Sequence, residues 1–111
     1  MTDETFDAYW LRFVRDHSRA GTQWMHLIGN AVSVGLLVSA IRRRSIGRAL
    51  LAPLPALAAS RISHRWIEQN TPLSAAEHPR WFLACELRMA RLLLTGGMKS
   101  EVRRALEAPR G

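Results

Sequence analysis

The stretch WMHLIGNAVSVGLLVSAI, residues 24–41, contains no Asp, Glu, Lys or Arg. As an α-helix it would be about 27 Å long, close to the roughly 30 Å thickness of the hydrocarbon core of a bilayer. Three arginines follow directly at 42–44, where lipid headgroups would lie. A chain of 111 residues has little other material with which to surround such a helix. The stretch therefore predicts a membrane-spanning helix rather than the core helix of a soluble protein.

A second apolar stretch, residues 46–63, has Pro53 and Pro55 in its middle and an arginine near each end. The prolines predict a kink, which a membrane helix tolerates where neighbouring helices satisfy the freed backbone groups. The arginines can extend their charged heads to the membrane surface. We expect this stretch to form a second span and to continue as a helix to about Gln69.

Two further segments have helical periodicity outside the apolar stretches. Residues 4–17 alternate apolar and charged positions as an amphipathic helix does. Another helix is expected from Pro79 to the glycines at 96 and 97, followed by a basic tail with a short C-terminal helix. The predicted fold class is all-α: one membrane-associated domain, residues 1–111, built as a membrane-embedded antiparallel bundle of about four helices plus that short helix.

The strong positive charge of the chain does not predict a nucleic-acid binder. The net charge is +7 and the pI about 11.4, but the arginines flank apolar segments instead of forming a basic stripe on a soluble element. Membrane lipids are therefore the expected partners, and nucleic acid is not. The single cysteine, Cys85, excludes an internal disulfide and a cysteine-rich zinc module.

The four histidines fall at one end of the predicted bundle. His17 closes the first helix, His26 lies in the first turns of the second, His64 lies near the end of the third, and His78 precedes the fourth. Antiparallel helices joined by short loops would bring all four to the same level. Because imidazole is the commonest side-chain metal ligand, the pattern predicts a site for iron, zinc, copper or nickel.

Polar side chains accompany two of these histidines at helical spacing. His26 shares a face with Asn30, and His64 shares a face with Glu68. Polar groups at membrane depth usually face the bundle interior, so Asn30 and Glu68 are candidates to orient the imidazoles. For Glu68 two alternatives stay open: a direct carboxylate ligand, or a helix cap or ion pair with a nearby arginine.

Three segments carry a resemblance to a known family. They are RDHSRAGTQWMHLIGN (15–30), SHRWIEQNTP (63–72) and HPRWFLACELRMARLLLTG (78–96). In these motifs, their order and their spacing, the chain resembles a family of small multi-pass membrane proteins whose characterised fungal member is a metal-dependent 2-hydroxy fatty acid dioxygenase of α-oxidation. The resemblance covers roughly residues 5–98.

The resemblance implies an enzyme with Fe(2+) as its cofactor, and a 2-hydroxy fatty acid and O2 as its substrates. The implied iron ligands or catalytic groups are His17, His26, His64 and His78. Asn70 belongs to the same H-x-x-x-E-x-N motif as His64 and joins the candidates for orienting the ligands. The substrate carboxylate would be held by an arginine through paired hydrogen bonds, for which the candidates are Arg61, Arg65 and Arg80.

The chain departs from the family pattern at Phe82, where a serine is usual, and at Cys85-Glu86, where Gly-Asp is usual. Glu86 keeps the negative charge, whereas Phe82 and Cys85 are expected to reshape the pocket. Two other functions stay open: a zinc-dependent lipid hydrolase, and a non-enzymatic membrane scaffold whose histidines pack or sense pH. The expected location is the inner membrane of a bacterium or the endoplasmic reticulum of a eukaryote.

Overall fold

The computed structural model describes residues 5–70 and 77–108, and every regular element in them is a helix. The elements are α1 (Phe6–Asp16), α2 (Ala20–Arg42), α3 (Ile46–Leu51), α4 (Leu54–Ile62), the π-helix η1 (Ser63–Glu68), α5 (Pro79–Thr95) and α6 (Met98–Glu107). The predicted all-α class is confirmed. The basic tail forms α6, as expected, and Gly96 ends α5 in the left-handed conformation with φ of 90°.

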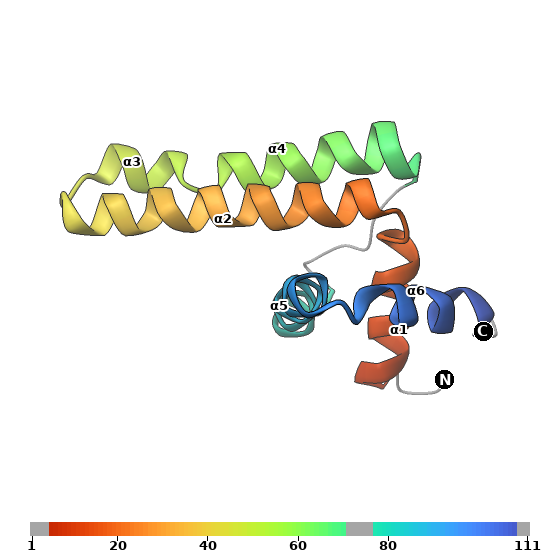
Figure 1. Cartoon of the computed structure of the whole chain (residues 1–111). Coiled ribbons are helices and arrows are strands. Elements are labelled where there is room, and N and C mark those ends of the chain that lie inside the picture. Colours follow the sequence, from red (N-terminus) through yellow and green to blue (C-terminus); the bar gives the residue numbers. More distant parts are fainter. Residues whose placement is uncertain (1–4, 71–76, 109–111) are drawn as a thin grey trace.

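The longest part of the molecule is a hairpin in which α2 runs antiparallel to α3 and α4 (Figure 1). Gly29 allows the two arms to approach closely. A Cβ atom at this position would lie 2.5 Å from the Cβ of Ala59 and 3.0 Å from the backbone oxygen of Pro55. Because Gly29 has no side chain, α4 can lie directly against the backbone of α2 at this position.

The second apolar stretch bends at its prolines, which confirms the predicted kink. Because Pro53 has no N–H to donate, the helix breaks into α3 and α4 instead of continuing unbroken. Ser33 of α2 accepts a hydrogen bond of 2.9 Å from the backbone N–H of Ala56, which has no partner within the first turn of α4. The helix then widens into η1 and ends at Gln69, whose φ is 57°.

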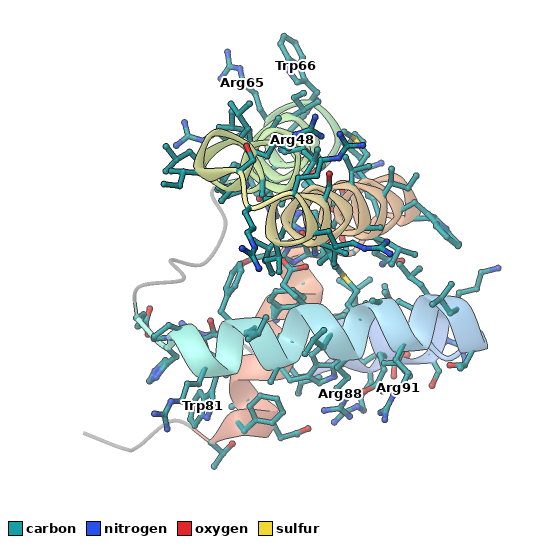
Figure 2. The ribbon with its side chains drawn as sticks, turned by 90° about the vertical axis from the view of Figure 1, so that its left-hand side faces the viewer. Arg48, Arg65, Trp66, Trp81, Arg88 and Arg91 are labelled. Atoms are coloured by element: carbon teal, nitrogen blue, oxygen red, sulfur yellow. The ribbon has the colours of Figure 1, made fainter. Side chains whose placement is uncertain are left out.

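The remaining helices form a second layer beneath the hairpin. Helix α5 runs across α2 and α4 rather than alongside them, and α1 and α6 pack against it (Figures 1 and 2). The predicted four-helix antiparallel bundle is therefore wrong in its packing: α2 and α4 form an antiparallel pair, but α1 and α5 do not extend it. The physical reason is the aromatic face of α1, which packs on α5 and α6. The buried side chains of this layer are Tyr9, Trp10, Phe13, Val14, Cys85, Met89, Met98 and Ala105.

Polar contacts attach α6 to α1. The indole N–H of Trp10 donates to Glu101 at 2.8 Å, and the guanidinium of Arg88 lies 4.5 Å from the Trp10 ring centre. Arg104 donates to Glu101 and to Asp7. The hydrogen bonds from Arg104 are the main cause that lowers the pKa of Glu101. The first helix, α1, and the last helix, α6, are therefore held together in one layer.

One helix of the described residues, α2, is long and apolar enough to cross a membrane. Its most apolar window has a mean hydropathy of 1.6, and 17% of that window is buried within the protein. The second apolar stretch does not form a continuous helix of this length because Pro53 divides it. The composition therefore identifies one candidate span where two were expected.

The close approach at Gly29 generates a stability prediction. We expect Gly29→Ala to lower the free energy of unfolding by about 1–3 kcal/mol, because the added methyl group has no space unless the helices separate. Gly35→Ala is the matched control on the same helix, since no atom lies within 4 Å of its added Cβ; it should be neutral or more stable by up to about 1 kcal/mol. Thermal unfolding of both variants checks this, and equal losses at the two positions would contradict it.

Candidate metal centre

Three of the four predicted histidines meet in the interior where α1, α2 and η1 come together. The side chains of His17, His26 and His64 are 1%, 2% and 3% exposed. One ring nitrogen from each lies within 4.8 Å of the other two, and the Nε2 atoms of His17 and His64 are 3.1 Å apart. These three residues, which we call the histidine cluster, form the candidate metal centre.

The Nδ1 atom of each ring in the histidine cluster faces a hydrogen-bond acceptor. His17 Nδ1 lies 2.7 Å from the backbone oxygen of Phe13, and His26 Nδ1 lies 3.0 Å from Glu86 Oε1. His64 Nδ1 lies 2.8 Å from Asn70 Oδ1, and the amide of Asn70 is oriented by a second bond, from Nδ2 to the backbone oxygen of Asp16. A neutral imidazole has a single N–H. In each ring that N–H is therefore on Nδ1, and Nε2 presents a lone pair.

These tautomers leave the lone pairs facing one another. The Nε2 atoms of His17 and His64 point at each other without a proton to share, and Nε2 of His26 is buried with no hydrogen-bond partner. Such an arrangement is unfavourable by itself, but a cation between the rings would satisfy all three nitrogens. Two nitrogens held at about 2.1 Å from one ion lie roughly 3 Å apart in adjacent positions. The cluster fits a first-row transition metal.

The environment of His17 and His64 favours the neutral form of these rings, which is the form that binds metal. Burial lowers the pKa of His17 well below its usual value, and the charge of a protonated His26 would lower it further. Burial also lowers the pKa of His64, although the hydrogen bond with Asn70 partly opposes the effect. Both rings are therefore ready to accept a cation at neutral pH.

Local backbone structure at two helix ends positions the ligands. His17 is the residue after the last turn of α1, and its ring folds back to the carbonyl one turn earlier while stacking on Phe13. On the other side, the wide turn of η1 and the left-handed Gln69 bring Asn70 back beneath His64, with its N–H bonded to the His64 carbonyl at 3.0 Å. π-Helical turns are frequent at functional sites, and this one brings Asn70 to Nδ1 of His64, a candidate ligand.

Glu68 caps a helix and does not join the histidine cluster. Its carboxylate accepts hydrogen bonds from the backbone N–H of Arg19 at 2.6 Å and from Ser18 Oγ at 3.2 Å. Arg19 is the N-cap of α2, so the carboxylate lies where the positive end of the helix dipole favours it. Of the alternatives for this residue, the structure supports the cap, which joins η1 to the turn that carries His17.

Glu86 contacts the candidate metal centre, a position that the sequence pattern did not predict. One carboxylate oxygen holds His26, and the other accepts a hydrogen bond of 2.9 Å from Asn30 Nδ2. Asn30 thus acts on His26 through Glu86 and not directly. The available signal was that Glu86 is the sole acidic residue of α5. Glu86 preserves the charge of the family pattern, and its partners follow only from the crossing of α5 over α2.

His78 does not come to the histidine cluster. It precedes α5, stacks on Trp81 with ring centres 4.5 Å apart, and meets the edge of Tyr9. The expectation that it would share a level with the other histidines assumed that α5 continues the antiparallel bundle. Because α5 instead crosses the hairpin, its N-cap residue, His78, lies against Tyr9 of α1.

An apolar groove of about 690 Å³ opens beside the histidine cluster between α2, α4 and α5. Its lining includes His26, Asn30 and Glu86 of the site, the departing residue Phe82, and Arg61. Cys85, which also differs from the family pattern, is buried in the aromatic layer and does not line the groove. Burial raises the pKa of its thiol to about 12. Of the two residues expected to reshape the pocket, Phe82 and Cys85, only Phe82 lines the groove.

The three candidate arginines for a substrate carboxylate occupy different places. Arg61 lines the groove. Arg65 lies 5.4 Å from the Trp66 ring centre, and both side chains point away from the body of the protein (Figure 2). Arg80 is exposed at the start of α5 and does not line the groove. The structure therefore places one of the three, Arg61, beside the site.

The contact between Glu86 and His26 generates a metal-affinity prediction. We expect Glu86→Ala to weaken binding of Fe(II) or Zn(II) by about 10–100-fold, because His26 loses the group that sets its tautomer and orientation. The control is Glu107→Ala, an exposed carboxylate on α6. Competitive titration with a chelator measures both variants. Unchanged affinity in Glu86→Ala would show that the contact does not serve metal binding.

One of three comparisons with known proteins identifies a family, and it agrees with the motifs. Comparison with curated proteins gave no match, and neither did comparison with solved structures. The family model described as 2-hydroxy-palmitic acid dioxygenase Mpo1-like matches residues 4–98, a span that contains the histidine cluster, Asn70 and Glu86. The resemblance drawn from the motifs is confirmed, and the chain belongs to the Mpo1-like family.

Proposed function

We propose that this protein is an iron-dependent dioxygenase that acts on 2-hydroxy fatty acids. The observation that carries the proposal is the histidine cluster: three buried imidazoles with converging lone pairs, one of which also lines an apolar groove. The description of the family supplies the reaction class. In the proposed reaction, a 2-hydroxy acid and O2 give CO2, water and the acid that is one carbon shorter. All four electrons taken up by O2 come from the substrate, so no separate reductant is needed.

The roles of the protein groups follow from their contacts. His17, His26 and His64 would hold the metal through Nε2, and when bound, Fe(II) would supply the redox chemistry between O2 and the substrate. Asn70 and Glu86 hold their histidines in the ligating tautomer. Because all three rings are at least 97% buried, the centre is shielded from bulk water, which favours oxidation of the bound substrate over side reactions.

Arg61 is the proposed partner of the substrate carboxylate. It lines the same groove as His26 and belongs to α4, one residue before the last residue of that helix. A guanidinium binds a carboxylate through two parallel hydrogen bonds, which fixes orientation as well as position. In this arrangement the hydroxyl-bearing carbon lies toward His26, and the alkyl chain extends along the groove.

The proposed functions of His78 and Glu68 are structural. His78 contacts the rings of Tyr9 and Trp81 just before α5, where these contacts would position that helix against α1. Glu68 holds the turn before α2 through its bond with the Arg19 N–H. Neither residue is needed to complete the proposed three-histidine ligand set.

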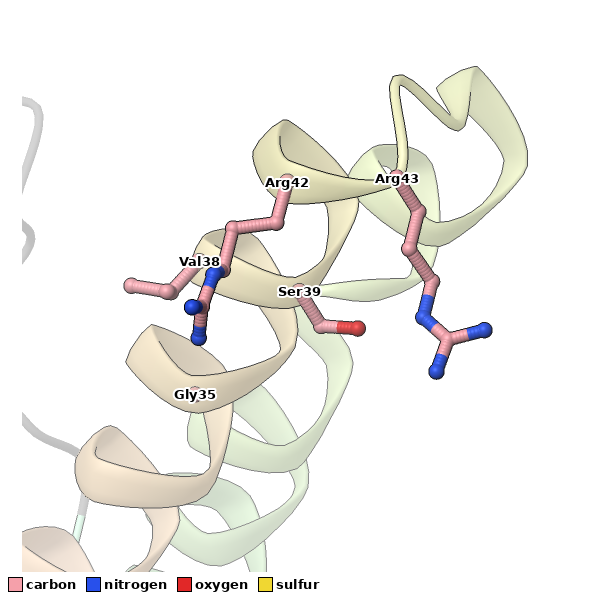
Figure 3. A pocket seen from close by; sticks show the side chains of 5 residues that line it. All are labelled: Gly35, Val38, Ser39, Arg42 and Arg43. Carbon is pink, nitrogen blue, oxygen red and sulfur yellow. The ribbon is translucent and has the colours of Figure 1, made fainter.

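We also propose that the hairpin of α2, α3 and α4 is embedded in a membrane. Its outer surface carries large apolar side chains, among them Ile28 at 59%, Ile41 at 68% and Leu50 at 73% exposed. At the tip, Arg42 and Arg43 lie beside a hollow of about 350 Å³ (Figure 3). Arginines at the tip of the hairpin would contact anionic headgroups at one membrane surface. The histidine cluster, at the other end of the hairpin, would then lie near the opposite surface.

Metal content and O2 consumption test the proposed reaction. Protein purified anaerobically in detergent and supplied with Fe(II) should bind one iron per chain and consume O2 with 2-hydroxypalmitic acid, releasing CO2 in equal amount. His64→Ala should lose the iron and the activity, because a ligand is gone. The control His78→Gln should retain iron, since its ring is outside the histidine cluster.

Other outcomes of this experiment point to other functions. Stoichiometric zinc without O2 uptake would favour a lipid hydrolase in which the metal activates water. Absence of bound metal in the native chain after anaerobic Fe(II) addition would reject both enzymes and leave a membrane scaffold. Loss of iron in His78→Gln but not in His64→Ala would reject the three-histidine ligand set.

Membrane insertion has its own test. We expect the native chain to stay with membranes after alkaline carbonate extraction. Val32→Asp, at a half-exposed position near the middle of α2, should be extracted more readily, because a central carboxylate costs about 2.5–3.5 kcal/mol in the bilayer. The control Leu106→Asp places the same charge on exposed α6. Complete extraction of the native chain would contradict the membrane proposal.

A further inference from the structure

The groove beside the histidine cluster has a polar end and an apolar end. At the polar end are His26, Arg61 and Glu86. At the other end, Val34 of α2 lies near Leu57 of α4, since Ser33 and the neighbouring Ala56 are joined by a hydrogen bond. From His26 to Val34 the distance along α2 is about 12 Å. The groove is thus a short trough that leads away from the candidate metal centre.

The sides of the groove are formed by side chains that also face outward. Val34, Leu57, Leu83 and Leu87 line it and are 60%, 54%, 61% and 64% exposed. A closed tunnel would bury such residues on all sides. Here the leucines of α4 and α5 form two edges with an opening between them, so a bound chain would remain in contact with the surroundings along its length.

We infer that the groove binds the first part of the substrate's alkyl chain as an open trough, so that the protein selects the 2-hydroxy carboxylate head but not the length of the chain. This inference rests on the proposed function. The positive charge of Arg61 complements the carboxylate at one end, and the apolar edges match an alkyl chain at the other. Val34, at the far end, is 60% exposed, so among the described residues this end is open to a longer chain.

Chain length has a limited effect in such a trough. Methylene groups within about 12 Å of the head contact Leu57, Leu83 and Leu87, and each one improves packing. Methylene groups beyond Val34 lie in lipid or detergent both before and after binding. They therefore add no binding free energy, since no apolar surface is transferred between unlike environments.

Chain-length profiles test this inference directly. In lipid vesicles, at equal surface concentration of substrate, apparent affinities for 2-hydroxypalmitic and 2-hydroxylignoceric acid should agree within about threefold. Val34→Trp, which narrows the far end of the trough, should weaken binding of 2-hydroxypalmitic acid about tenfold more than binding of 2-hydroxyoctanoic acid. Val32→Trp is the matched control, because Val32 is 49% exposed on the same helix and does not line the groove. Much weaker binding of 2-hydroxylignoceric than of 2-hydroxypalmitic acid by the native chain would reveal a closed end and overturn the inference.

Photo-crosslinking separates failure of the inference from failure of the proposed function, because it requires no turnover. A 2-hydroxypalmitic acid with a diazirine near its carboxylate should label Leu57, Leu83 or Leu87, and one with the diazirine at the far end should label mainly lipid. Groove labelling without O2 uptake would reject the dioxygenase and support the binding site. O2 uptake with labelling elsewhere on the protein would overturn the groove and leave the dioxygenase standing.

Discussion

The candidate metal centre depends on one arrangement: three buried imidazoles that each have an acceptor at Nδ1. A backbone carbonyl, an asparagine amide and a carboxylate take these positions for His17, His64 and His26. With the protons held on the outer nitrogens, the inner nitrogens converge as lone pairs. For His17 and His64, burial and neutrality support each other, because uncharged rings cost less to bury and burial lowers the pKa of both rings.

The rest of the fold brings the three acceptors to their rings from different directions. Helix α1 ends just before His17 and provides the first acceptor, the backbone oxygen of Phe13. The π-helical turn of η1 and the left-handed Gln69 provide the second by reversing the chain at Asn70. Helix α5 provides the third by crossing the hairpin, so that Glu86 reaches His26 and Asn30. The aromatic layer of α1, α5 and α6 keeps that crossing in place, with Trp10 as its largest buried side chain.

The hairpin has two distinct surfaces. Its outward surface carries exposed aliphatic side chains and ends in arginines, which is the pattern expected of a segment in contact with lipid. Its inner surface, facing α5, contains the groove that begins at His26. In the proposed membrane-embedded arrangement, a hydrophobic substrate would pass from lipid to the candidate metal centre over the edges of the groove, without crossing water.

Much of the local structure was predictable from the sequence. The uncharged stretch at 24–41 predicts α2, the prolines predict the bend before α4, and the glycines after Thr95 predict the end of α5, because each depends on neighbours in the chain. The motifs likewise identified the family. Helical spacing also placed Asn30 on the face of His26, although it could not show that Glu86 lies between them.

The sequence by itself determined the helices, the family and the residue types able to bind metal, since propensity, periodicity and motif spacing are local properties. The tertiary structure decided which of those residues meet. His78 is separated from the histidine cluster and Glu86 becomes the partner of His26 because α5 crosses the hairpin instead of extending a bundle. Glu68 becomes a cap because η1 lies against the turn before α2. That crossing depends on how the aromatic side chains of α1 pack against α5 and α6, which is a long-range property that no local pattern encodes.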